Sequence, residues 1–185
     1  MDLGFRMHAE RTPNPNSIKW VLGQALLEPG QSAHFREPVG TSVSPLAARL
    51  FAVEGVEAVF LAANFVTVTK DPAVEWADLA EPLVGAIKDF AESGASPLGP
   101  DWTPRPPGEA GEVVERIRRI LDDEIRPAVA MDGGDIVFAG FRDGVVELYM
   151  QGSCQGCPSS TMTLKLGIEE RLREAIPEVR AVEAI

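Results

Sequence analysis

The chain has 185 residues, of which 45% are hydrophobic, so it can form one large domain or two small ones, each with its own core. Its formal net charge is −11 and no basic patch dominates, which argues against nucleic acid as a partner. No apolar run approaches the roughly 20 residues that span a bilayer, so we expect no membrane segment.

The cellular compartment is predicted from the N-terminal residues and from the two cysteines. The first residues, M-D-L-G-F-R-M-H, lack a basic stretch followed by an apolar one, so we expect no secretory signal. Two cysteines three residues apart do not make a secreted disulfide framework. We therefore expect a bacterial cytoplasmic protein, or a mitochondrial matrix protein whose presequence has been removed.

The first half alternates strands with two helices. Ser44 and Pro45 form a typical helix start, and Gly55 is expected to end that helix. Apolar residues spaced by three and four from Trp76 to Phe90 predict a second helix, which ends near Gly94. Strands are expected at residues 3–10, 17–22, 32–36, 56–61 and 65–69.

Residues 93–108 are rich in proline and glycine, and we expect them to form a semi-rigid linker. The linker would separate a first domain at residues 1–92 from a second at 109–185. Trp102, inside the linker, is most simply interpreted as a packing residue, and docking of one domain on the other is the alternative.

The second half predicts a small α+β domain with the order α-β-β-α-β. An amphipathic helix at 112–126 should stop at Pro127, and Asp143-Gly144 between apolar runs is a hairpin signal. Asp132 and Asp135 flank Gly133-Gly134, and we interpret them as turn-capping residues. The remaining elements are expected to be strands at 136–141, 145–150 and 179–185 and a helix at 159–175.

Cys154 and Cys157, the only cysteines, stand in the run Q-G-S-C-Q-G-C-P. Pro158 is typical of a first helical turn, so Cys157 should lie at a helix N-terminus, where the pKa of a thiol is lowered. Thiolates bind metal, but C-x-x-C also serves thiol–disulfide exchange, a shared zinc site or a plain structural pair. From the residues alone, these alternatives stay open.

Three runs carry a resemblance to a known family. R-P-A-V-A-M-D-G-G-D-I-V-F-A-G (126–140) and V-V-E-L-Y-M-Q-G-S-C-Q-G-C-P-S-S-T-M-T-L-K (145–165) closely resemble the NifU-like C-terminal domain, and T-P-N-P-N-S-I-K-W (12–20) resembles the start of the Nfu N-terminal domain. The resemblance implies an iron–sulfur cluster carrier or scaffold, usually for [4Fe–4S], with Cys154 and Cys157 as ligands. It also implies upstream cluster donors and apo-protein clients.

An iron–sulfur cluster commonly takes four thiolates, whether it is [4Fe–4S] or [2Fe–2S], and one chain supplies two. The loaded form should therefore be a homodimer. The first domain has no cysteine, and the resemblance gives it a role in partner choice; an interaction adaptor is the alternative. We find no phosphate loop and no nucleophile with a base beside it, so we expect no enzymatic activity.

Overall fold

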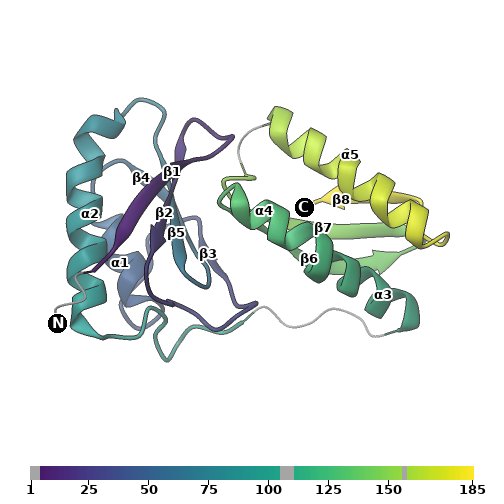
Figure 1. Cartoon of the computed structure of the whole chain (residues 1–185), viewed down its shortest axis with the longest axis horizontal. Coiled ribbons are helices and arrows are strands. Elements are labelled where there is room, and N and C mark those ends of the chain that lie inside the picture. The colour runs from purple at the N-terminus through teal and green to yellow at the C-terminus, as the bar shows by residue number, and fades with distance from the viewer. Residues whose placement is uncertain (1–4, 105–110, 156–157) are drawn as a thin grey trace. The chain divides into compact units, whose positions relative to one another are not determined.

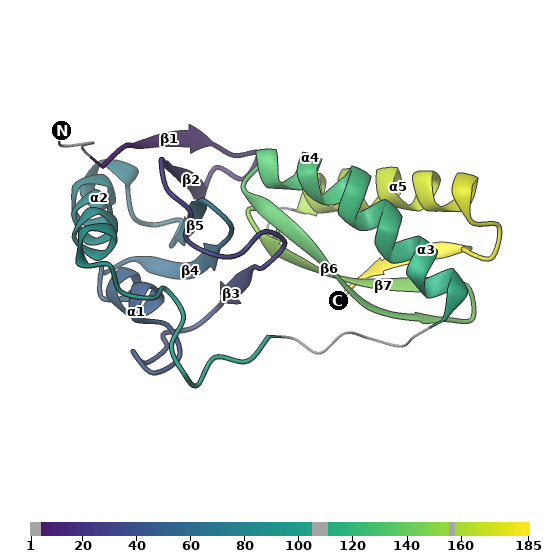
Figure 2. The ribbon, with the colours of Figure 1, turned by 60° about the horizontal axis from the view of Figure 1, so that its bottom comes forward.

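The computed structural model of the chain describes residues 5–104, 111–155 and 158–185. It divides into two compact units, Met1–Pro104 and Arg105–Ile185 (Figures 1 and 2). Each combines a sheet with helices, as the α+β prediction requires. No helix within the described ranges is long and apolar enough to cross a membrane.

The first unit is built on a five-stranded antiparallel sheet with strand order β1-β2-β5-β4-β3. The apolar faces of its two helices pack into one core with strand residues such as Val66 and Val68. The elements are β1 Met7–Arg11, β2 Ser17–Leu22, β3 Ala33–Phe35, α1 Pro45–Phe51, β4 Val56–Leu61, β5 Phe65–Lys70 and α2 Trp76–Ser93.

The helix boundaries of this unit were largely predictable from cap residues. The Ser44 hydroxyl accepts a hydrogen bond from the Ala47 N–H (3.1 Å), which confirms it as the N-cap of α1. Gly94 ends α2 in the left-handed conformation, as expected. Gly55, however, does not end α1, which stops at Phe51; its positive φ of 96° serves the turn into β4 instead.

The segment after α2 is held by the first unit. The Gly99 N–H donates to the Val43 carbonyl (2.8 Å), and the Asp101 N–H donates to that of Ser42 (2.9 Å). Trp102 packs against the core of the first unit, which confirms its interpretation as a packing residue. Part of the expected linker is thus ordered by backbone hydrogen bonds, while residues 105–108 lie outside the described ranges.

The second unit has a three-stranded sheet of order β6-β7-β8, in which β6 and β7 are antiparallel and β7 and β8 parallel. Asp143 and Gly144 both have positive φ (52° and 82°), which confirms the predicted hairpin turn. The elements are α3 Glu112–Ile120, the π-helical turn η1 Leu121–Ile125, α4 Arg126–Met131, β6 Gly134–Arg142, β7 Val145–Gly152, α5 Pro158–Ala175 and β8 Ala181–Ala184.

Pro127 does not end the first helix of this unit, so that prediction was wrong. The helical path continues to Met131, because the π-helical turn at 121–125 ends two residues before the proline. A proline in a regular α-helix clashes with the carbonyl four residues earlier. The wider π turn relieves this conflict and lets Pro127 stand at the start of α4.

Candidate metal-cluster site

Residues 153–155, which we call the cysteine loop, follow β7 and carry Cys154. Hydrogen bonds join this loop to the one between α4 and β6. The Ser153 N–H donates to the Gly133 carbonyl (3.3 Å), and the Ser153 hydroxyl donates to the carbonyl of Asp132. On its other side, the Thr161 hydroxyl of α5 donates to the Cys154 carbonyl (2.7 Å). Elements on both sides therefore fix the backbone that carries Cys154.

Gly133 and Gly134 serve this contact in different ways. Gly133 has a φ of 79°, in the left-handed region that glycine adopts without steric cost. At residue 134 no side chain fits, because a Cβ there would lie 2.5 Å from the Cys154 sulfur and 2.8 Å from the Gln151 carbonyl oxygen. The bare backbone at residue 134 is thus part of the wall against which the thiol packs.

Cys154 is a buried free thiol with 8% of its surface exposed. Burial raises the pKa of this thiol to about 11, and the charges of Asp132 and Asp135 act in the same direction, while a hydrogen bond with Ser153 opposes them. At neutral pH the thiol is therefore protonated. The lowered pKa was expected for Cys157, which lies outside the described residues.

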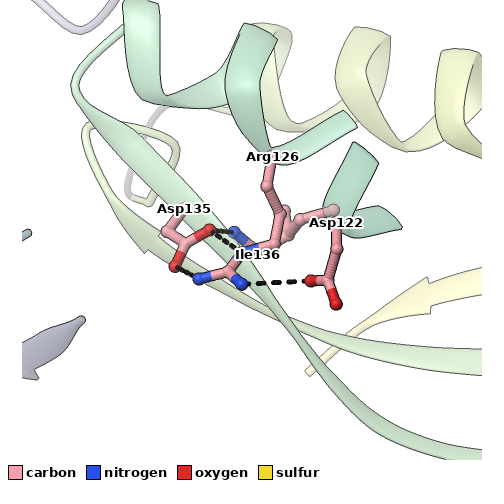
Figure 3. Close-up of polar contacts among 4 residues, drawn as sticks. All are labelled: Asp122, Arg126, Asp135 and Ile136. Atoms are coloured by element: carbon pink, nitrogen blue, oxygen red, sulfur yellow. Dashed lines mark hydrogen bonds and ion pairs between the residues drawn. The ribbon is translucent and has the colours of Figure 1, made fainter. Parts of the chain in front are cut away.

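A partly buried ion pair supports the start of β6 (Figure 3). Arg126 donates from Nε and Nη2 to the two carboxylate oxygens of Asp135, both at 2.7 Å, and the Ile136 N–H donates to the same carboxylate (2.8 Å). Asp122 binds Nη1 of the same guanidinium at 3.0 Å. The interpretation of Asp135 as a turn cap was wrong, because its carboxylate neutralises an arginine nine residues earlier in the chain.

Three other arginine contacts also join parts that are distant in sequence. Arg116 donates to the Ala175 carbonyl (2.7 Å), and the Arg118 guanidinium lies 4.9 Å from the centre of the Phe138 ring. At the surface, Arg171 of α5 binds Glu124 of η1 through two hydrogen bonds of 2.6 and 2.8 Å. That pair lowers the pKa of the Glu124 carboxyl.

The possible metal donors are few. Within the described ranges, no group of three or more His, Cys, Asp or Glu side chains could hold a metal ion. His8 binds Glu10 (2.9 Å), and His34 packs edge-on against the Phe60 ring, both in the first unit. The soft ligands of this chain are therefore Cys154 in its anchored loop and, by sequence, Cys157.

Comparisons with known proteins match both units. A family model of the NifU-like domain matches residues 117–183, and one of the scaffold protein Nfu/NifU N terminal matches residues 7–94. The NFU1 iron-sulfur cluster scaffold homolog, mitochondrial, of Homo sapiens is 45% identical over 97% of this chain and 71% of its own length. Its counterpart from Drosophila ananassae is 44% identical over 97% of this chain and 64% of its own length.

Solved structures were matched as well. The solution structure of a NifU-like protein from Saccharomyces cerevisiae is 20% identical, with a TM-score of 0.46, over 55% of this chain and 92% of that one.

Proposed function

The chain belongs to the Nfu family of NifU-like proteins, and we propose that it is a non-enzymatic iron–sulfur cluster scaffold. Its cargo is a [4Fe–4S] cluster bound through Cys154 and Cys157 of two copies and passed to apo-proteins. The observation that carries the proposal is the anchored loop, in which Gly134 makes room for a single thiol beside backbone atoms.

The number of thiolates per chain determines how many copies bind one cluster. A cluster of this type takes four thiolates, and the chain has two cysteines, so two copies must share one cluster. Binding requires Cys154 to lose its proton, because thiolate is the ligand form and the pKa of this thiol is about 11. A site divided between two chains also opens by separation of the copies, which suits a protein that hands its cargo on.

Thiol–disulfide exchange has less support. The attacking cysteine of such enzymes is a thiolate at neutral pH, held in an accessible and electropositive place. Cys154 has the opposite character, because it is buried and the nearby carboxylates Asp132 and Asp135 raise its pKa. Zinc shared by two chains remains chemically compatible with the thiolates, and the experiment below separates it from a cluster.

The test is anaerobic reconstitution of the full chain with ferrous iron and sulfide, with Cys154→Ala and Cys157→Ala in parallel. Iron and sulfide content, visible and Mössbauer spectra and native mass spectrometry are measured, followed by transfer to an apo-protein that needs [4Fe–4S]. We expect one cluster per two chains and colourless, monomeric variants. A wild-type chain that stays colourless, or that holds only zinc, contradicts the proposal.

The first unit supplies no thiolate, and we assign it the choice of clients and donors. If the protein is a cluster carrier, a chain starting at residue 105 should still bind cluster but deliver it to fewer clients. If it is an interaction adaptor, the same deletion should abolish its function. The relatives are named mitochondrial, so a eukaryotic source would place the chain in the matrix and a bacterial source in the cytoplasm.

A further inference from the structure

Exposed apolar side chains gather around the cysteine loop. In the described part of the chain, four large hydrophobic residues are more than half exposed, and all belong to the second unit: Met131 (74%), Met162 (56%), Leu166 (55%) and Ile185 (54%). Single exposed hydrophobic residues are ordinary on protein surfaces. Met131, Met162 and Leu166, however, all lie close in sequence to residues that contact the cysteine loop, and this shared position requires an explanation.

Met131 borders the loop on one side. It is the last residue of α4, and the next residue, Asp132, accepts the hydrogen bond from the Ser153 hydroxyl. Met131 is therefore the direct sequence neighbour of a residue that contacts the loop carrying the thiol.

Met162 and Leu166 border the loop on the other side. Met162 directly follows Thr161, whose hydroxyl binds the Cys154 carbonyl, and Leu166 lies one helical turn further along α5. Both views show that α4 ends and α5 begins at the same end of the second unit (Figures 1 and 2). Met131 thus lies on one side of the cysteine loop and Met162 and Leu166, on the first turns of α5, lie on the other; together we call them the loop-flanking apolar surface.

We propose that this loop-flanking apolar surface is the face that a second copy of the chain covers when a cluster is bound. The inference rests on the proposed function, because a cluster with four thiolates brings two cysteine loops together. Side chains one or two turns from each loop then lie in the contact between the copies. A two-fold contact places the same surface of both copies against itself, so that surface must be self-complementary.

Charge favours a second copy over a client as the occupant. Each chain carries a net charge of −11, so two copies repel each other over most of their surface. All residues between Glu147 and Lys165 are uncharged, and this stretch includes the cysteine loop with Met162. An uncharged stretch that includes Met162 can meet its own copy without repulsion, and methionine side chains adapt their packing.

The size of the surface explains why the contact would depend on the cluster. A stable protein interface buries at least about 1,200 Å² in total, far more than three side chains and their copies supply. The chain without cluster should therefore be a monomer, and the cluster should supply the remaining attraction.

The test uses two opposite double variants of the full chain, Met162→Glu/Leu166→Glu and Met162→Lys/Leu166→Lys. Each is reconstituted alone and as an equal mixture, and the loaded species are weighed by native mass spectrometry and size-exclusion chromatography. Each variant alone should dimerise roughly tenfold or more weakly than wild type, because like charges face each other. The mixture should recover as heterodimers, because glutamate then faces lysine.

Ile185→Glu and Ile185→Lys are the matched controls. Ile185 has a similar exposure and follows β8, which pairs with residues 145–148, the part of β7 farther from the cysteine loop. These variants should load and dimerise like wild type. Thermal unfolding followed by circular dichroism verifies that all variants fold, and a photo-cross-linking residue at position 162 should link loaded copies without any added charge.

Normal loaded dimers from both double variants would overturn the inference, and slower transfer from them would assign the surface to a client or donor. Failure of the mixture to recover would overturn it equally. A wild-type chain that binds no cluster would overturn both the proposed function and the inference. The two failures are distinguishable, because the inference alone fails when wild type loads in a Cys154-dependent manner and the variants behave identically.

Discussion

Replacement of Gly134 by alanine tests the packing of the thiol directly. The new Cβ would lie 2.5 Å from the Cys154 sulfur and 2.8 Å from the Gln151 oxygen, whereas ordinary contacts are about 3.5–4.0 Å. The sulfur must therefore move by about 1 Å, or the paired ends of β6 and β7 must open. Overpacking of this kind costs about 1–3 kcal/mol, and metal–ligand distances tolerate only about 0.2 Å.

We expect Gly134→Ala to lower the free energy of unfolding by about 1–3 kcal/mol in urea titrations and to reduce the iron bound per chain after reconstitution. Gly167→Ala is the control, because nothing lies within 4 Å of its Cβ and alanine favours helix α5. In a Cys154→Ala background the cost of Gly134→Ala should shrink but persist, since the Gln151 oxygen remains. Wild-type stability and loading of Gly134→Ala would refute this reasoning.

Four other predictions concern charged or titratable groups. Asp135→Ala should lower the free energy of unfolding by about 2–4 kcal/mol in urea, because it leaves the Arg126 guanidinium partly buried without its main partner; an unchanged midpoint would contradict this. Cys154 should be alkylated slowly at pH 7 and faster towards its pKa of about 11, as iodoacetamide kinetics would show. Folding raises the pKa of Cys154 above the value of about 8.5 in the unfolded chain, so the folded state holds this proton more tightly. The resulting contribution to the free energy of unfolding is fully present below about pH 8.5 and is lost as pH rises towards 11. Cys154→Ala should remove this decline. Glu124→Gln should leave the urea midpoint unchanged within error, because its pair with Arg171 is exposed to solvent.

The elements that could be predicted from sequence are those with local signals. Ser44 and Pro45 marked the start of α1 because the capping bond is local and joins Ser44 to Ala47, three residues later. Asp143-Gly144 marked the hairpin because two adjacent residues must adopt positive φ. The α-β-β-α-β order of the second unit followed from such signals.

The features that sequence could not supply depend on contacts between distant residues. The pairing of Asp135 with Arg126 depends on how α4 packs on β6, and neighbouring glycines made the aspartate look like a turn residue. The proline-rich look of residues 94–104 concealed backbone hydrogen bonds to Ser42 and Val43. Composition reports what a segment avoids, regular helix and strand, and does not report what it binds.

The cysteine motif shows the same division within one site. The residue types of Cys154 and Cys157 identify soft ligands, because thiol chemistry belongs to the side chain itself. The protonation of Cys154 belongs to the fold, because burial and the carboxylates of Asp132 and Asp135 raise its pKa. A C-x-x-C pattern therefore cannot separate a redox nucleophile from a metal ligand until the surroundings of the thiol are known. Here the surroundings keep Cys154 protonated at neutral pH, which slows nucleophilic attack, and a metal bound by this thiol would have to displace its proton.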